Sequence, residues 1–212
     1  MFAIGHFALG YLTGKATSKL AHVKINLPLL LAVSVIPDVD LLFSGFMDHR
    51  GLTHSLIVIG ILSVPFFAKY KKAMLPYLAA ILSHVFLGDL FTGGIEFLWP
   101  ISKTSFGLAL AVSSLPVSII ELALFFISLT VMYQQNDLQT LFKPANRNFF
   151  LIVCFGATVG PLFWYLQNVP GAISVLLIIP SIIWLCIFAY SLLIDLRFKL
   201  SVFANNRHQI KG

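Results

Sequence analysis

Apolar residues occur along this chain in long runs that are separated by short polar stretches. Most runs have the length and apolarity typical of helices that cross a bilayer. The first run is short for a span, but it continues as a helical pattern to about Ala21 if Lys15 and Lys19 extend to the membrane interface. The pattern predicts an all-α integral membrane protein, a helical bundle of about seven hydrophobic segments. The predicted segments cover residues 1–21, 27–46, 54–68, 74–91, 108–133, 149–166 and 172–194.

Composition also favours a membrane protein. Of 212 residues, 58% are hydrophobic and only 10% are charged, whereas soluble domains have roughly 25% charged residues. A soluble fold of this size could not bury so much apolar surface, so one lipid-embedded domain is expected instead of two soluble ones. Cys154 and Cys186 both lie inside apolar runs, which predicts buried, unreactive thiols and no zinc finger.

The net charge of +6 comes from dispersed basic residues and not from one basic stripe, so no direct nucleic-acid binding is expected. If seven segments alternate across the bilayer, all Lys and Arg residues except Arg50 and Lys103 lie on one side. The positive-inside rule makes that side cytoplasmic. This predicts a multi-pass protein with its N-terminus outside and its C-terminus in the cytoplasm. The residues on the predicted inner side are Lys15, Lys19, Lys24, Lys69, Lys71, Lys72, Lys143, Arg147, Arg197, Lys199, Arg207 and Lys211.

Most other ionisable residues near the apolar segments collect on the outer side of this topology, although only Lys and Arg define it. A charge within a span costs about 2.5–3.5 kcal/mol on insertion scales. Asp38, Asp40 and Asp89 must therefore be paired, hydrated or bound to metal. The residues of this outer set are His6, Asp38, Asp40, His49, Arg50, His54, His84, Asp89 and Glu96.

Carboxylates and imidazoles together are suitable ligands for a divalent metal, with Zn as the first expectation and Mn or Fe as the others. A bound ion would neutralise the acids and lower the pKa of a water to about 7, which supplies a nucleophile without Ser or Cys. The set is larger than one zinc ion needs. Either two ions bind, or some members act as bases and as partners that orient the ligands. The predicted metal ligands are His6, Asp38, Asp40, His49, His54, His84 and Asp89.

Several of these residues also have a purely structural interpretation. His6 could be a core histidine bonded to a carbonyl, and Thr53 could be the N-cap of the third segment. Asp38 could cap a helix, but Asp40 two residues later makes capping alone a poor explanation. His84 lies deep in an apolar segment, where an ionisable side chain usually serves a function.

The polar residues lie in short motifs, and these motifs resemble those of a known family. The motifs are G-H at Gly5–His6, I-P-D-V-D at Ile36–Asp40, H-R-G-L-T-H-S at His49–Ser55, L-S-H at Leu82–His84 and F-L-W-P at Phe97–Pro100. The family is the YdjM-like group of prokaryotic inner-membrane-associated metal-dependent hydrolases, one branch of which carries the label LexA-binding. The resemblance covers roughly residues 1–108, and the H-R-G-x-T-H-S block is its most specific part. It implies metal-dependent hydrolysis at the inner membrane without indicating a substrate.

The chain departs from the family pattern in its fourth segment. The pattern has His and Asp four residues apart on one helical face, whereas His84 and Asp89 are five apart, with Gly88 where the acid would be. On an ideal helix the two side chains would diverge by about 140 degrees. A π-bulge or a helix break at Gly88 would bring them together again, and without one Asp89 would not be a ligand.

Residues and resemblance together predict a membrane-bound metal-dependent hydrolase, in which activated water attacks a lipid or lipid-linked ester at the outer membrane face. Asp38 or Asp40 is expected to be the general base. Arg50 is expected to hold an anionic group, which favours a phosphoester over another ester or an amide. The hydrolase-like core is predicted within residues 1–107, while residues 108–212 add transmembrane helices and a basic cytoplasmic tail to the same compact domain.

Two other classes of function are consistent with the sequence. A divalent-cation transporter or channel also needs intramembrane Asp and His. Such a path should carry polar residues through the full depth of the bilayer. The inner halves of the predicted segments are mostly apolar, with Glu121 as the main exception, which argues against a path. A non-catalytic membrane scaffold could instead bind a cytoplasmic partner through the basic inner loops, although the topology already explains those loops.

Overall fold

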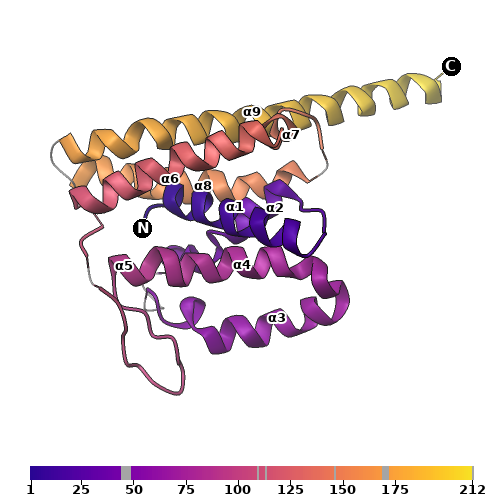
Figure 1. Ribbon diagram of the computed structural model, residues 1–212. Coiled ribbons are helices and arrows are strands. Elements are labelled where there is room, and N and C mark those ends of the chain that lie inside the picture. The colour runs from indigo at the N-terminus through magenta and orange to yellow at the C-terminus, as the bar shows by residue number, and fades with distance from the viewer. Residues whose placement is uncertain (44–48, 109, 113, 146, 169–171, 212) are drawn as a thin grey trace.

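The computed structural model describes residues 1–43, 49–108, 110–112, 114–145, 147–168 and 172–211 (Figure 1). Helices form nearly all of the regular structure in these ranges, and none of the described residues belongs to a β-strand. One isolated antiparallel bridge pairs Ile95 with Phe106. The predicted all-α fold is therefore confirmed.

Helix α1 (Ala3–Leu20) lies at the centre of the bundle, and its range agrees with the first predicted segment. It contacts α2, α4, α6, α8 and α9, whose bounds follow below. Phe7 and Tyr11 are fully buried on it. Gly10 and Gly14 allow the close approach, since a Cβ at Gly10 would lie 2.2 Å from Ser34 Cβ and one at Gly14 would lie 2.6 Å from Leu30 Cδ1. Small residues spaced by four thus let neighbouring side chains pack directly against the backbone of α1.

The second predicted segment is broken into two short pieces. Helix α2 (Leu27–Val33) starts after Asn26, whose side chain accepts a hydrogen bond from Leu29 N at 3.5 Å. The 3-10 helix η1 (Ile36–Phe43) follows and carries the Pro-Asp-Val-Asp motif. An α-helix of seven residues is only about 10 Å long. Neither piece can cross a hydrocarbon core of about 30 Å, and residues 44–46 of the predicted segment lie outside the described ranges.

The third and fourth segments form a helical hairpin. Helix α3 (Leu56–Tyr70) is capped by Ser55, which accepts a hydrogen bond from Val58 N at 3.4 Å. The prediction of Thr53 as the N-cap is wrong, because its hydroxyl bonds to a carboxylate described below. The remaining elements of the hairpin are the 3-10 turn η3 (Lys71–Met74), α4 (Leu75–Ser83), the π-helix η4 (His84–Asp89) and α5 (Leu90–Thr92).

The second half of the chain packs against the other side of α1. Phe125, Trp184 and Phe188 join Phe7 in one aromatic cluster. One core therefore connects residues 1–107 with the rest of the chain. Cys154 is buried as predicted, but Cys186 is exposed, because its side of the helix faces outward. The elements are α6 (Leu115–Gln134), α7 (Leu138–Leu141), η5 (Asn148–Phe150), α8 (Leu151–Asn168) and the long α9 (Ala172–Lys211).

Within the described ranges, three helical stretches are long and apolar enough to cross a membrane, namely Leu56–Thr92, Leu115–Gln134 and Leu176–Phe203, and Asn148–Phe163 is a shorter apolar helix. Their outward faces carry large apolar side chains, as lipid contact requires. The number of spans and the orientation of the termini stay predictions. The C-terminal ends of α1, α3, α6 and α9 do lie toward one end of the bundle (Figure 1). The predicted inner basic residues lie in the C-terminal halves of α1, α3 and α9 and in the connections that follow α1, α3 and α6.

Candidate metal centre

Five of the predicted ligands converge at a common point inside the bundle. His6 comes from α1, Asp38 from η1, His84 and Asp89 from η4, and His54 from the short 3-10 helix η2 (Leu52–His54). The three imidazoles and Asp89 are buried. Asp38 is the solvent-facing member, with a side chain that is 17% exposed. These five residues are called the central cluster below.

The distances within the central cluster suit one coordination sphere. Ligand atoms from His6, Asp38, His84 and Asp89 all lie within 4.8 Å of one another. His54 Nε2 lies 3.0 Å from Asp89 Oδ2 and 3.2 Å from His84 Nε2. Donors bound at about 2.0–2.2 Å from one ion cannot be more than about 4.4 Å apart. The group could therefore close around a divalent ion with small adjustments.

A π-helix explains how two residues spaced by five share one face. In a π-helix the backbone hydrogen bonds run from residue i to i+5, so such residues lie one above the other. His84 and Asp89 are the first and last residues of η4, and His84 Nε2 lies 3.5 Å from Asp89 Oδ2. Of the alternatives that the sequence left open, the structure shows the π-bulge. Gly88 also provides the space for His6, because a Cβ there would lie 2.4 Å from His6 Cε1.

Hydrogen bonds to the Nδ1 atoms orient two of the imidazoles. His84 Nδ1 lies 2.7 Å from Ser34 O. A carbonyl only accepts, so Nδ1 carries the proton and a neutral His84 has its lone pair on Nε2. His54 Nδ1 lies 3.4 Å from Asp40 Oδ2 and 3.0 Å from Thr53 Oγ1, which favours the same tautomer. Both Nε2 atoms then point lone pairs into the central cluster, as in metal-binding histidines.

Some polar atoms of the central cluster have no hydrogen-bond partner in the described part of the chain, although Asp89 Oδ1 accepts from the Met1 ammonium and from Arg50 Nη2. Among the described residues, Asp89 Oδ2 and both ring nitrogens of His6 are buried without a hydrogen-bond partner. Two Nε2 lone pairs that face each other beside a carboxylate repel unless a positive charge lies between them. Either a proton on one ring or a metal ion supplies that charge. The donor set therefore fits a divalent cation that takes the place of protons.

Asp40 and His49 are predicted metal ligands, but they pair with each other beside the central cluster. Asp40 Oδ1 lies 2.9 Å from His49 Nδ1. Asp40 Oδ2 accepts hydrogen bonds from Arg50 N at 3.1 Å and from Thr53 Oγ1 at 2.8 Å. Burial disfavours the charged carboxylate, but hydrogen bonds with His49, His54 and Thr53 hold the pKa of Asp40 well below its ordinary value. Both oxygens of Asp40 are thus occupied, and it orients the loop that carries His54.

A second group of possible ligand atoms comes from Asp38, Asp40 and His49, which also lie within 4.8 Å of one another. Asp38 belongs to both groups. His49 is 36% exposed, whereas the imidazoles of the central cluster are buried. The structure thus separates the seven predicted ligands into the central cluster of five and a flanking pair, Asp40 and His49.

Arg50 contacts the central cluster through its guanidinium. Nη2 lies 3.3 Å from Asp89 Oδ1, and Nη1 donates to Thr92 O at 3.1 Å. Its backbone is left-handed, with φ 68°, which is uncommon for a residue with a side chain. The bond from Arg50 N to Asp40 helps to hold this conformation. Arg50 Nε is buried without a hydrogen-bond partner among the described residues.

Glu121 and Thr92 belong to this region, but the sequence did not indicate their roles. Glu121 is fully buried on α6, and its Oε1 accepts a hydrogen bond from Phe2 N at 2.9 Å. It thereby satisfies an amide at the start of α1, the helix that carries His6. The lone acid in an apolar segment was the available signal. Thr92 Oγ1 accepts from Arg50 Nη2 at 3.2 Å, and no sequence signal distinguishes it from other threonines.

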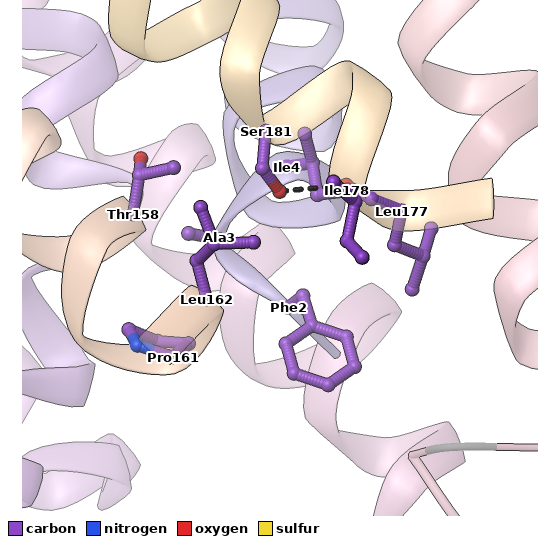
Figure 2. Close-up of a pocket in the computed structure, with 9 residues that line it drawn as sticks. All are labelled: Phe2, Ala3, Ile4, Thr158, Pro161, Leu162, Leu177, Ile178 and Ser181. Atoms are coloured by element: carbon purple, nitrogen blue, oxygen red, sulfur yellow. Dashed lines mark hydrogen bonds between the residues drawn. The ribbon is translucent and has the colours of Figure 1, made fainter. Parts of the chain in front are cut away.

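A small pocket elsewhere in the bundle has no part in the candidate centre. Figure 2 shows that Ala3 of α1, Thr158 and Leu162 of α8, and Leu177 and Ser181 of α9 surround it. Its volume of about 10 Å³ is enough for one water at most. Thr158 and Ser181 both donate to carbonyls of their own helices, so no unsatisfied group faces the pocket. We assign it no substrate.

The fold and the central cluster define a class: a helical membrane protein whose buried His and Asp residues could hold a divalent metal ion. The chain belongs to the YdjM inner membrane protein family, whose sequence model matches residues 1–194. The resemblance found from the motifs is confirmed, and it extends well beyond the first 108 residues. No curated protein and no solved structure matches the chain.

Proposed function

We propose that this protein is a metal-dependent hydrolase embedded in the inner membrane, with its metal held by the central cluster. The observation that carries the proposal is the close approach of His54 Nε2, His84 Nε2 and Asp89 Oδ2, where Asp89 Oδ2 has no hydrogen-bond partner among the described residues. Three imidazoles and two carboxylates favour Zn, Mn or Fe over Mg or Ca, which prefer all-oxygen sites. Zn is the first choice because histidine and carboxylate ligands are typical of catalytic zinc.

A divalent ion bound there would supply an acidified water and would polarise the bond to be cleaved. The residues around it divide the remaining tasks. Asp38 is the member of the central cluster that solvent reaches, so it is positioned to accept a proton from an entering water. Asp40 has both oxygens occupied, which favours a positioning role for it. Of the two predicted bases we therefore favour Asp38.

The substrate class that we propose is a lipid or lipid-linked phosphoester. Arg50 supports a phosphate, because its planar guanidinium matches phosphate oxygens and its Nε has no partner in the described part of the chain. The candidate centre lies between helices with lipid-like outer surfaces, so a substrate from the bilayer can reach it more readily than a soluble one. The outer face of the membrane is the expected side.

Cation transport is less well supported. A path would have to continue from the central cluster along the central helix α1, where Phe7 and Ala8 are fully buried and Phe7 packs against Trp184 and Phe188. The polar contact farther along, between Tyr11 and Asp137, lies beyond this apolar layer. A scaffold role needs no buried donor set at all. We therefore place hydrolysis first.

The experiment combines metal analysis with hydrolysis. Purified wild-type protein should retain a transition metal after dialysis, whereas Asp89→Asn and His54→Ala should lose it. His22→Ala is a matched histidine control, because His22 lies outside the central cluster. Wild type should hydrolyse a member of a panel of lipid phosphoesters, and the two cluster variants should not. Retention of metal by both cluster variants would refute the proposed centre, and metal binding without any turnover would refute the hydrolase.

A further inference from the structure

An apolar groove adjoins the candidate metal centre. It lies between α1, the consecutive elements η4 and α5, and α6, and it has a volume of about 230 Å³. A dry apolar cavity of about 150 Å³ is enough to bind benzene, so this groove has room for a chain of several carbons. Its walls include Leu87, Phe91, Thr92, Leu110, Ile120 and Leu124.

The groove faces the region where lipid is expected. It lies between two of the candidate membrane spans, Leu56–Thr92 and Leu115–Gln134. Leu87, Phe91 and Ile120 are 43%, 39% and 46% exposed. A cavity open to hydrocarbon tails and lined by apolar side chains favours an occupant from the bilayer over a water-soluble metabolite.

Thr92 connects the groove to the central cluster. It lines the groove, and its Oγ1 accepts a hydrogen bond from Arg50 Nη2 at 3.2 Å. The same Arg50 nitrogen lies 3.3 Å from Asp89 of the central cluster. Thr92 therefore lies between the apolar slot and the Arg50 guanidinium, and the ammonium of Met1, which also lines the groove, donates to Thr92 Oγ1 at 2.6 Å. That is the arrangement expected for a molecule with one apolar chain and one anionic end.

We propose that the groove holds one hydrocarbon chain of an anionic phospholipid, with its phosphate against Arg50 beside the central cluster. The inference rests on the proposed function where it treats the bound lipid as the substrate, since it then identifies the part of the substrate that the protein recognises. The binding itself does not depend on turnover. Burial of the chain drives association, and the charge on Arg50 selects the anionic headgroup.

The test uses phosphatidic acid that carries a photoreactive diazirine near the middle of one acyl chain. Full-length protein in phosphatidylcholine nanodiscs is irradiated with this probe, and labelled peptides are mapped. Wild type should be labelled in residues 87–92 and 117–124. Ile120→Trp fills the groove and should lose this labelling. Ile119→Trp is the matched control, because Ile119 is 53% exposed on the same helix and does not line the groove.

Three outcomes would overturn the proposal. One is labelling spread evenly over the lipid-facing helices, and another is groove labelling that survives Ile120→Trp. The third is equal labelling by a phosphatidylcholine probe with the same diazirine chain, which would remove the selectivity for an anionic headgroup. Melting temperature and metal content are measured for Ile120→Trp and Ile119→Trp, so that loss of labelling through unfolding can be distinguished from loss of lipid binding. Groove labelling without hydrolysis would refute the proposed function while the chain site stands.

Discussion

Gly88→Ala is the most direct perturbation of the candidate centre that leaves every proposed ligand in place. Gly88 lies within the π-helix, directly against the His6 imidazole. An added Cβ would lie 2.4 Å from His6 Cε1 and 2.7 Å from His6 Nδ1. Carbon atoms in ordinary contact are about 3.5 Å apart or more. The ring, the backbone or both must therefore move by about 1 Å.

The ring has no free space into which it can move. His6 is fully buried, and its ring stacks on His84 with centroids 3.6 Å apart. Ligand distances in metal sites hold within about 0.2 Å, so a shift of about 1 Å removes His6 from the coordination sphere. We expect metal affinity to fall about 10–100-fold, as for other changes that disturb ligand orientation. Overpacking should also lower stability by about 1–3 kcal/mol.

The assay is metal competition against a chelating dye, with a thermal melt on the same detergent-purified samples. Gly60→Ala is the matched control, since a Cβ at Gly60 of α3 would meet nothing within 4 Å. It should keep wild-type metal affinity and gain roughly 0.5–1 kcal/mol in helix stability.

A second control is His6→Ala, in which Gly88→Ala should have little further effect on metal affinity if the two act through the same contact. Wild-type metal affinity in Gly88→Ala itself, without loss of stability, would refute this reasoning.

Three further predictions concern the surroundings of the cluster. Gly93→Ala should push the Arg50 guanidinium aside, because its Cβ would overlap Nη1; metal content should persist, while affinity for inorganic phosphate falls roughly tenfold or more. Unchanged phosphate affinity would contradict it. Thr53→Val should lower stability by about 1–3 kcal/mol in a denaturant melt, because a buried carboxylate loses a donor, whereas Thr53→Ser should not. After removal of both native cysteines, Lys103→Cys and Lys71→Cys should react with an impermeant maleimide from opposite sides; same-side labelling would refute the predicted topology.

The amino-acid sequence by itself determined the helical fold and the set of polar residues in the central cluster. Four helices begin within a few residues of their predicted starts, namely α1, α3, α8 and α9. Helix α6 starts later than predicted, at Leu115 rather than at residue 108. Runs of apolar residues are a local signal, and the cost of charge in hydrocarbon makes each intramembrane Asp or His conspicuous. Motif order then identified the family, which the match to residues 1–194 confirms.

Only the tertiary structure decided the division of labour among these residues. Asp38 and Asp40 are two positions apart on one 3-10 helix, yet one joins the central cluster and the other bonds the loop from His49 to Thr53. Sequence spacing could not separate them, because the difference depends on a loop that folds back over the motif. The left-handed conformation of Arg50 has the same origin, since contacts with residues distant in sequence compensate for its backbone.

The π-helix shows the same limit from the other direction. Spacing alone places His84 and Asp89 on different faces of an ideal helix. The sequence allowed a bulge that would bring them together, but it did not indicate whether the bulge forms. The choice depends on Gly88 meeting His6 of α1, a contact between segments about eighty residues apart. Helical periodicity depends on residues that are close in sequence, whereas the convergence of the ligands and the groove beside them depend on how the helices pack.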